Sequence, residues 1–282
     1  MNKIENCEFT GERALFNSFA LELENVRFHN GESPLKESEN ITLSSCEFAW
    51  KYPLWYCKDI TVDKSILKET ARSGIWYTHG IEMTNCIIEA PKTFRRSSDI
   101  TLTNVELPFA SETMWNCDGI RLTDVKIVGD YFGFGSSNVC ADNVDVDGNY
   151  LFDGGKNIII KDSKLISKDA FWNCENVVVE NCLIVGEYLG WNSKNVTFIN
   201  CTIESNQGMC YMENVTLRDC KLVNTDLCFE YCTVDAEICS HIDSVKNPIS
   251  GRIVADSIGE IILEADKVDV SATKIIEVKK NV

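Results

Sequence analysis

The chain has 282 residues, of which 44% are hydrophobic and 25% are charged, a composition typical of folded domains and not of disordered segments. It carries 43 acidic and 27 basic residues, for a formal net charge of −16. This charge disfavours nucleic acid and anionic membranes as partners, because phosphate binding needs a basic surface. No apolar run reaches the roughly 18 residues that a membrane helix needs.

The first residues, MNKIENCEFTGER, lack the apolar core and the small-residue cleavage site of a signal peptide, so we expect a cytoplasmic protein. In that compartment the 14 cysteines are expected to be free thiols. The closest pair is Cys228 and Cys232, and no histidine spacing completes a zinc site around it. We therefore expect no metal and no cofactor.

An apolar residue that follows Asn or Asp recurs about every 19 residues along the chain. Two looser units, at residues 2–9 and around Leu21, precede the regular series. That series is Ile41, Ile60, Ile81, Ile100, Ile120, Val139, Ile158, Val177, Val196, Val215, Val234 and Ile253. Its steps are 19, 21, 19 and 20, and then 19 throughout. Such a fixed period indicates a solenoid.

Within each unit, apolar residues alternate with polar ones in the pattern h-x-h-x-N-C-x-h. Period-two alternation predicts short strands with one buried face, and the Asn or Asp that interrupts it predicts a bend. A unit of 19 residues fits one coil of a parallel β-helix, which stacks each strand on its equivalent in the next coil. We expect an all-β, single-stranded parallel β-helix of about 13–14 coils, forming one domain over residues 1–282. Residues 1–20 would be the N-terminal cap or first coil, 21–247 the regular coils, and 248–282 the C-terminal capping coils.

Cysteine recurs in the sixth position of this pattern, directly after the bend. It stands there at Cys46, Cys86, Cys182, Cys201, Cys220 and Cys239, and Val or Ser replaces it in other units. Free Cys behaves as a small, usually buried hydrophobe, and packing tolerates Val and Ser where metal ligation would not. We interpret the cysteines as rungs of an internal ladder.

The second half of many units carries a stretch rich in aromatic residues and glycine. These stretches are GERALF (11–16), KYPLWYC (51–57), PKTFRRS (91–97), ETMWNC (112–117), GDYFGFGSSN (129–138), GNYLFDGGKN (148–157), KDAFWNCEN (168–176) and GEYLGWNSKN (186–195). With these stretches the chain resembles the pectate-lyase-like superfamily. More closely, it resembles an uncharacterised bacterial family of β-helix proteins of unknown function. The resemblance implies a right-handed coil and, by analogy with the superfamily, saccharides lying along one strand face. It implies no assigned activity.

Five of the six tryptophans fall in one column, five residues before each apolar anchor. The column reads Trp55, Trp76, Arg95, Trp115, Phe134, Asp153, Trp172, Trp191, Cys210 and Phe229. Because Arg95 and Asp153 share it, we expect the column to face outward, as an aromatic stripe that binds ligand together with the neighbouring Arg96. The alternative, that the tryptophans belong to the core, stays open at this stage.

The catalytic candidates are Asp130, Asp153, Asp169 and Arg95. The carboxyl pair of a glycosidase must lie within roughly 5–9.5 Å, and these aspartates meet that condition only if the turns fold back. The resemblance implies further patterns, paired aspartates with a histidine for hydrolases and an arginine base beside aspartates for lyases. The hydrolase pattern is missing from this sequence, and FDGG (152–155) is the stretch nearest to it. The lyase pattern is only half present, because Arg95 and Asp153 share a column but lie three coils apart.

Two functions follow from the outward stripe. The first is carbohydrate binding or processing, with an oligosaccharide as partner and, for an enzyme, polysaccharide lyase or glycoside hydrolase activity. The second is a non-catalytic rod that self-associates or scaffolds another protein through the same stripe.

Overall fold

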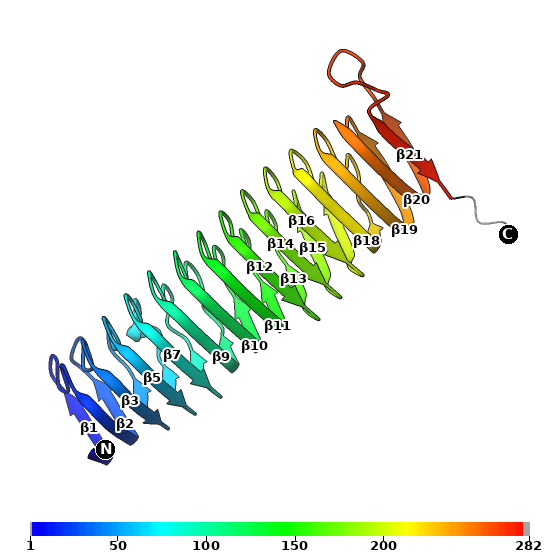
Figure 1. The fold of residues 1–282 in the computed structure, drawn as a ribbon. Coiled ribbons are helices and arrows are strands. Elements are labelled where there is room, and N and C mark those ends of the chain that lie inside the picture. The colour runs from blue at the N-terminus through cyan, green and yellow to red at the C-terminus, as the bar shows by residue number, and fades with distance from the viewer. Residues whose placement is uncertain (1, 279–282) are drawn as a thin grey trace. The chain divides into compact units, whose positions relative to one another are not determined.

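The computed structural model describes residues 2–278, and its strands run parallel in successive coils (Figure 1). It comprises two compact units, Met1–Asp145 and Val146–Val282. The fold is an all-β parallel solenoid of about 15 turns with about 19 residues per turn. This confirms the predicted fold class, with slightly more turns than the 13–14 expected. The interpretation of residues 1–282 as one domain stays a prediction.

The first unit holds β1 (Asn2–Thr10), β2 (Phe19–His29), β3 (Glu39–Ser44), β4 (Glu47–Phe48), β5 (Lys58–Asp63), β6 (Ile66–Leu67), the 3-10 helix η1 (Glu69–Ala71), β7 (His79–Thr84), β8 (Ile87–Ile88), β9 (Ser98–Leu107), β10 (Asp118–Val128) and the start of β11 (Ser137–Asp147). The second unit holds β12 (Lys156–Lys161), β13 (Lys164–Ile166), β14 (Glu175–Glu180), β15 (Leu183–Glu187), β16 (Lys194–Ile199), β17 (Thr202–Asn206), β18 (Glu213–Val223), β19 (Thr233–Lys246), β20 (Ser250–Ile262) and β21 (Thr273–Glu277). Among the described residues, no helix is long and apolar enough to cross a membrane.

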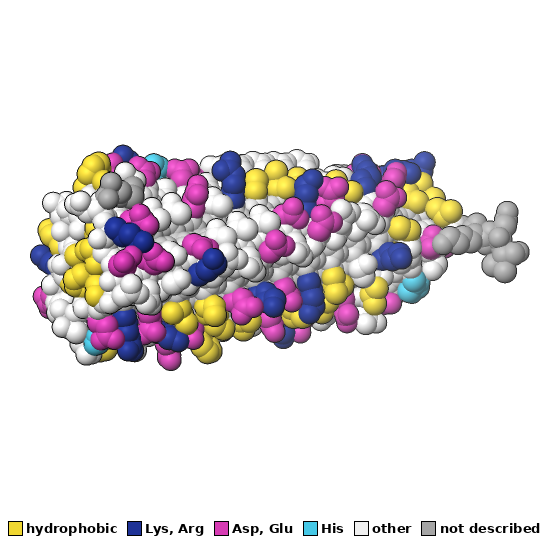
Figure 2. All heavy atoms as spheres, turned by 90° about the horizontal axis from the view of Figure 1, so that it is seen from below, with side chains coloured by type: hydrophobic (Ala, Val, Ile, Leu, Met, Phe, Trp, Pro, Cys, Tyr) yellow, Lys and Arg dark blue, Asp and Glu magenta, His cyan; other side chains and the backbone are white. Residues whose placement is uncertain are grey.

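The period of the sequence sets the register of the strands. In the first unit Ile41 pairs with Ile60, Ile60 with Ile81, and Ile81 with Ile100. In the second unit Val177 pairs with Val196 in the same way. Equivalent apolar side chains therefore stack directly over one another inside each unit, and the anchors of this series are buried. Acidic and basic side chains are interspersed on the outer surface (Figure 2).

The register changes after β18, and two predicted positions are wrong there. A bulge places Ile238 opposite Cys220, so Cys239 turns outward and is exposed instead of forming the next rung. The following coil is shorter, and Gly251 pairs with Val234 where Ile253 was expected. Gly251 has φ +120°, and a Cβ there would lie 1.9 Å from the Val234 carbonyl oxygen, so only glycine fits.

The bend before each cysteine position is a residue in the left-handed conformation, and at this position most residues are asparagine or aspartate. Their side chains hydrogen-bond from coil to coil. The Nδ2 of Asn181 donates to Asp162 Oδ1 at 2.9 Å, and Asn200 Nδ2 donates to Asn181 Oδ1 at 2.9 Å. Asn tolerates this backbone at low cost, and the ladder also satisfies its amide. The same residue type therefore both turns the chain and links neighbouring coils.

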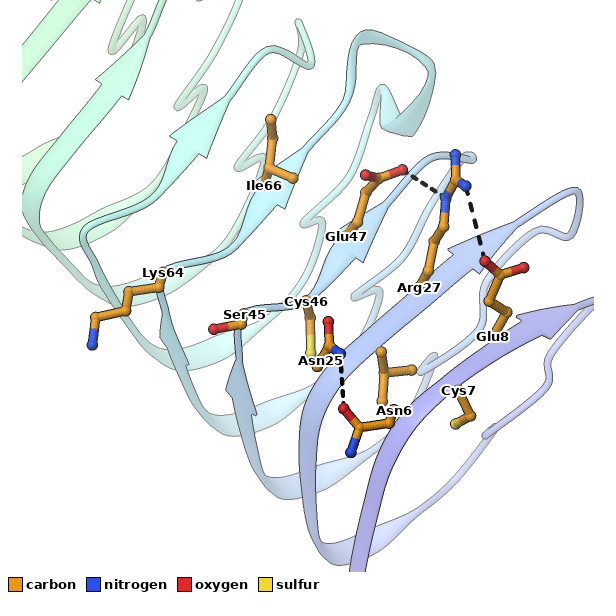
Figure 3. A pocket seen from close by; sticks show the side chains of 11 residues that line it. Asn6, Cys7, Glu8, Asn25, Arg27, Ser45, Cys46, Glu47, Lys64 and Ile66 are labelled. Carbon is orange, nitrogen blue, oxygen red and sulfur yellow. Dashed lines mark hydrogen bonds and ion pairs between the residues drawn. The ribbon is translucent and has the colours of Figure 1, made fainter.

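The asparagine ladder of the first unit is interrupted in the coils of β3 to β6. Asn25 Nδ2 donates to Asn6 Oδ1 at 2.8 Å, but Ser45 and Lys64 take the next two bend positions. A hollow of about 460 Å³ opens beside this gap, and Ser45 and Lys64 are among the residues that line it (Figure 3). The charged residues that line the hollow include Arg27, whose guanidinium pairs with the Glu47 carboxylate at 2.8 Å. The hollow lacks aromatic side chains.

The cysteine after each bend does more than fill space. Cys201 Sγ donates to the Val179 carbonyl at 3.4 Å, and Cys220 Sγ donates to the Phe198 carbonyl at 3.4 Å. Both carbonyls belong to the preceding coil, so these thiols link neighbouring coils. Side chains at this position also accept from the N–H of the equivalent residue one coil earlier: Ser65 Oγ accepts from the Cys46 N–H at 2.9 Å, and Cys182 Sγ accepts from the Ser163 N–H at 3.4 Å. This explains why Cys and Ser exchange at these positions.

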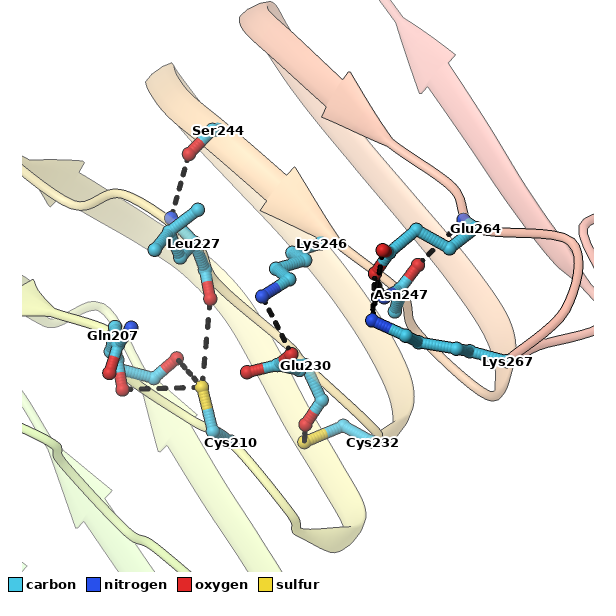
Figure 4. A network of polar contacts seen from close by, with 11 residues as sticks. Gln207, Cys210, Leu227, Glu230, Cys232, Ser244, Lys246, Asn247, Glu264 and Lys267 are labelled. Atoms are coloured by element: carbon cyan, nitrogen blue, oxygen red, sulfur yellow. Dashed lines mark hydrogen bonds and ion pairs between the residues drawn. The ribbon is translucent and has the colours of Figure 1, made fainter.

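A polar network ties the tail of the second unit to the coil before it (Figure 4). The buried Asn247 donates to Glu264 at 2.6 Å, and Lys267 pairs with the same carboxylate at 2.9 Å. The neighbouring Lys246 pairs with Glu230 at 2.9 Å. These contacts hold the segment after β20 against the last wide coil, where the buried face of β20 narrows to Ile253 and Ala255.

We predict that Asn181→Ala lowers the free energy of unfolding by about 1–3 kcal/mol, because it removes two ladder bonds and strains a left-handed residue. Asn181→Gly loses the same bonds without the strain, and should cost about 1 kcal/mol less. Urea denaturation of both variants measures the difference. Equal stability of the two variants would contradict the assigned role of the backbone.

The burial of the thiols predicts which cysteines react. Cys140 and Cys239 are exposed and Cys7 is partly exposed, whereas the other 11 cysteines are buried. Burial raises the pKa of Cys57 and of Cys174 to about 12, so these thiols are not ionised at neutral pH. Titration of the native protein with an aromatic disulfide at pH 8 should label Cys140 and Cys239 first, and the buried set only after denaturation. Rapid labelling of Cys182 or Cys201 would refute the internal ladder.

Candidate functional site

The predicted aromatic column of the first unit lies on the turns before β5, β7, β9, β10 and β11. Trp55 and Trp76 stack with ring centroids 5.1 Å apart and planes 9° from parallel. The Arg95 guanidinium lies 5.2 Å from the Trp76 ring and 4.3 Å from the Trp115 ring, and Phe134 continues the row 5.1 Å beyond Trp115. All five side chains are half-buried, and none belongs to the core.

The indole N–H groups fix these rings in place. Trp76 Nε1 donates to the Lys92 carbonyl at 2.8 Å, and Trp115 Nε1 donates to the Tyr131 carbonyl at 2.7 Å. Both carbonyls lie on the next coil. Ring faces are thus covered by the neighbouring rung, and ring edges meet the solvent. A sugar that stacks flat on an aromatic face finds no such face along the middle of this column.

Arg95 is a paired structural cation. Its Nη2 lies 2.7 Å from Glu112 Oε2, and Lys92 Nζ lies 3.2 Å from the same oxygen. Partial burial opposes ionisation of Glu112, but hydrogen bonds from Lys92 and Arg95 outweigh it and lower the pKa of this carboxyl. With its charge paired and its plane between two indoles, Arg95 is poorly suited to act as a general base.

A second row, one residue further along each turn, is more exposed. Tyr56 and Tyr77 stack at 4.8 Å with planes 6° apart, and Tyr56 is 49% exposed. Arg96 lies 6.0 Å from the Tyr77 ring, and Lys36 lies 5.5 Å from the Tyr56 ring. Cations therefore flank the aromatic rows locally, on a chain whose net charge is strongly negative.

The remaining tryptophan, Trp50, lies outside the column and stacks on no other ring among the described residues. Its only ring contact there is the Lys51 ammonium, 5.6 Å from the centroid. A hollow of about 330 Å³ lies beside it, and its lining is Trp50, Lys51, Glu69, Thr70, Arg72 and Pro91. Arg72 and Glu69 are exposed and form no ion pair with any described residue. This hollow combines an indole that carries no stacked ring with free hydrogen-bonding groups.

The wall of the Trp50 hollow is the 3-10 helix η1. It fills the coil between Ile60 and Ile81, which is two residues longer than the 19-residue period. Ala71 is buried and anchors the turn, and Thr70 Oγ1 donates to the Ala49 carbonyl at 2.8 Å. The sequence prediction missed this site because Trp50 does not lie five residues before an apolar anchor, as the other five tryptophans do. The 21-residue step was the available signal.

In the second unit the aromatic row follows a different set of residues. Trp172 and Trp191 lie 6.1 Å apart, as predicted neighbours, but the row continues through Tyr211, 4.6 Å from Trp191, and then Tyr231, 5.3 Å beyond it. Cys210 and Phe229 were expected in the row and are instead fully buried. The aromatic positions of these coils are shifted from the column that was counted back from the apolar anchors. This shift turns the side chains of Cys210 and Phe229 inward.

The carboxylate candidates are distributed over both units. Asp130 is exposed in the first unit, and Asp153 and Asp169 belong to the second. Asp153 Oδ1 accepts a hydrogen bond from Asn173 at 2.9 Å, as part of an amide ladder. No described residues form a group of three or more His, Cys, Asp or Glu side chains suited to a metal ion.

Asp169 has the most altered electrostatic environment of these candidates. It is 9% exposed, and this burial raises its pKa; the nearby Glu187 and Asp153 add to the increase, and a hydrogen bond from Tyr150 and the charge of Lys168 oppose it. A raised pKa beside other carboxylates is one requirement of a general acid. Near-complete burial leaves little of this carboxyl for a substrate to touch.

Comparison with known proteins places the chain in a family and adds only distant structural likenesses. A model described as "Protein of unknown function (DUF3737)" matches residues 2–276. No curated protein sequence matches the chain.

Solved structures with a similar fold are remote in sequence. The A-module of the mannuronan C-5 epimerase AlgE4 of Azotobacter vinelandii is 11% identical, with 84% of this chain and 91% of that one covered and a TM-score of 0.38. PfbA, a surface adhesin of Streptococcus pneumoniae, is 10% identical over 87% and 71%, with a TM-score of 0.36. The tailspike of the E. coli bacteriophage HK620, solved with a pentasaccharide, is 8% identical over 97% and 69%, with a TM-score of 0.33. Likenesses of this size carry no argument about function.

The environment of Asp169 makes a prediction about pH. Because its folded pKa is raised, the native state holds this proton more tightly than the unfolded chain does. The carboxyl therefore lowers stability as pH rises from the ordinary aspartate pKa, about 3.9, through the raised folded value. Asp169→Asn should be more stable than the parent at pH 7, and the difference should vanish below about pH 4. Thermal unfolding at several pH values measures it.

Asp162→Asn is the matched control, since Asp162 is also left-handed but exposed. Its effect on the melting temperature at pH 7 should be small. A loss of stability in Asp169→Asn at pH 7 would contradict the electrostatic account.

Proposed function

The chain belongs to the DUF3737 family of proteins of unknown function, and from that premise we propose that it binds carbohydrate at the Trp50 hollow of its first unit. The observation that carries the proposal is Trp50 itself, with no stacked aromatic neighbour and set beside Arg72 and Glu69, whose charges are not paired with described residues. The proposal is limited to binding, since Arg95 is paired and Asp169 is nearly buried.

The lining matches the two chemical sides of a pyranose. Such a ring has an apolar C–H face, which packs on an indole, and a rim of hydroxyl groups, which need donors and acceptors. Lys51 and Arg72 supply donors, Glu69 supplies an acceptor, and the Thr70 hydroxyl, which already donates to the Ala49 carbonyl, adds a second acceptor. Lys51 is already paired with Glu32 at 3.1 Å, but a wholly apolar ligand would leave Arg72 and Glu69 desolvated and without partners.

The aromatic column supports this site without forming it. Tyr52 lies 4.6 Å from Trp55, so the segment that follows Trp50 and Lys51 is packed onto the first rung of the column. The stacked rungs Trp55, Trp76 and Arg95 in turn hold three consecutive coils in register. Trp50 and η1 are thereby presented from a rigid base, which reduces the entropy lost on binding.

Isothermal titration against a panel of neutral and acidic oligosaccharides tests the proposal. We expect at least one glycan to bind, and Trp50→Ala and Arg72→Ala each to weaken it by about tenfold or more, which corresponds to about 1.4 kcal/mol. A preference for acidic glycans would assign the main contribution to Lys51 and Arg72.

Two control variants separate the site from the rest of the unit. Phe109→Ala removes an aromatic ring that is 56% exposed and lies outside the hollow, and Arg121→Ala removes an exposed arginine of another strand, β10. Both should bind as the parent does. Silence across the whole panel, or full affinity in Trp50→Ala, would overturn the proposal.

A further inference from the structure

The N-terminal coil leaves its core residues incompletely covered. β1 pairs in parallel with β2 on one side, and Figure 1 shows it as the first strand of the stack. The residues of β2 that face the core, Leu23, Val26 and Phe28, are at most 2% exposed. Their equivalents in β1, Ile4, Cys7 and Phe9, remain partly exposed.

More apolar surface continues around the same end of the unit. Phe19 is 68% exposed and Phe16 is 37% exposed. In Figure 2 hydrophobic side chains lie at this end, among acidic and basic ones. The uncovered edge of β1 also presents backbone N–H and C=O groups that a further strand could pair with.

The sequence of β1 is complementary to itself when it is read in the opposite direction. Its inward positions are Asn2, Ile4, Cys7 and Phe9, because the left-handed Asn6 shifts the alternation by one residue. If residue i faces residue 11 − i of an antiparallel copy, Ile4 meets Cys7 and Asn2 meets Phe9, so every inward side chain meets an inward one. On the outer face Lys3 meets Glu8, a pair of opposite charges.

Other registers fail on one of these two counts. A shift of a single residue places inward side chains opposite outward ones. A shift to i opposite 13 − i brings Glu5 against Glu8, two like charges, and Cys7 against the exposed Asn6. The shift in alternation at Asn6 therefore selects one antiparallel register.

We propose that the outer edge of β1 is the interface of a head-to-head homodimer, in which two copies of β1 pair antiparallel in the register that places Lys3 opposite Glu8. The two-fold contact covers Ile4, Cys7 and Phe9 of both copies. It also ends the row of unpaired backbone groups, because each edge strand becomes an inner strand. The proposal does not depend on carbohydrate binding.

Both charged residues already have partners within their own copy. Lys3 Nζ lies 2.6 Å from Glu24 Oε2 and 2.9 Å from Glu5 Oε2, and Glu8 Oε2 lies 3.1 Å from the His29 ring. The side chains are nevertheless 42% and 59% exposed, so a second copy can reach them. These internal contacts also make a charge exchange informative, since swapping Lys3 and Glu8 does not restore any of them.

Sedimentation velocity of the full chain across protein concentrations tests the interface. We expect a species of twice the 31.8 kDa monomer mass. Lys3→Glu and Glu8→Lys should each raise the dimer dissociation constant by about tenfold or more, because each places like charges opposite one another twice. The double variant should restore dimerisation. Lys126→Glu, which reverses an exposed lysine of β10, should dimerise as the parent does.

Ile4→Asp should abolish the dimer, whereas Phe109→Asp, at an exposed ring outside the interface, should leave it intact. Should Ile4→Asp unfold the first coil, the charge exchange still decides the matter, because it changes only exposed side chains. A monomer at all concentrations, a dimer indifferent to Lys3 and Glu8, or a double variant that is not restored would each overturn the proposal. So would a different protein found paired with β1 of a monomeric chain.

Discussion

Stacking of equivalent residues from coil to coil is the constraint on which the rest of this structure depends. Parallel pairing in register places each side chain beside its equivalent in the next coil, about 4.8 Å away. A residue type that interacts well with itself at that spacing is therefore favoured at every position. Asn181 bonds to its equivalents by its amide, Cys201 fills the core and bridges to a carbonyl, and Trp55 stacks on Trp76. These side chains differ in chemistry but satisfy the same geometric rule.

The same rule separates structural from functional aromatic residues. A ring that stacks on its equivalent has its faces covered, and its indole N–H is satisfied by the next coil, as at Trp76 and Trp115. Such a ring stabilises the solenoid and offers only an edge to a ligand. A ring that departs from the repeat has no equivalent to stack on. Trp50 is in that position, beside the only 3-10 helix of the described residues, and no other ring stacks on its faces there.

Sequence periodicity predicted the fold class, the strand register of most coils and the inward cysteines, because those features repeat with the period. It failed where the coil length changed without a visible break in the pattern. The bulge after Cys220 moved Cys239 outward, and phase shifts turned Cys210 and Phe229 inward. A column count assumes that each coil has the same length, and a single extra or missing residue reverses the direction of every side chain until the next bend.

The site was less accessible to sequence reasoning than the fold, for a related physical reason. The tryptophan column was prominent because its members repeat, yet repetition is what covers their faces. Arg95 was a catalytic candidate in the aromatic column, but the turn brings Glu112 to it, a contact between residues 17 positions apart. Periodic patterns report on stacking, and they carry little information about contacts that occur once.

A solenoid must also resolve the problem of its ends, since a stack of identical coils leaves one uncovered face at each end. At the C-terminal end of the second unit the core narrows to Ile253 and Ala255, and Asn247, Glu264 and Lys267 tie the tail down with polar contacts. The first coil keeps its full width instead, with Ile4 and Phe9 in the positions that Leu23 and Phe28 fill one coil later. A tapered end reduces the apolar area that needs covering, whereas a full-width end preserves a flat edge. A flat edge is suited to pairing with another strand. The pattern of inward and outward side chains in β1 is the same when it is read in the opposite direction, so a second copy of β1 fits that edge.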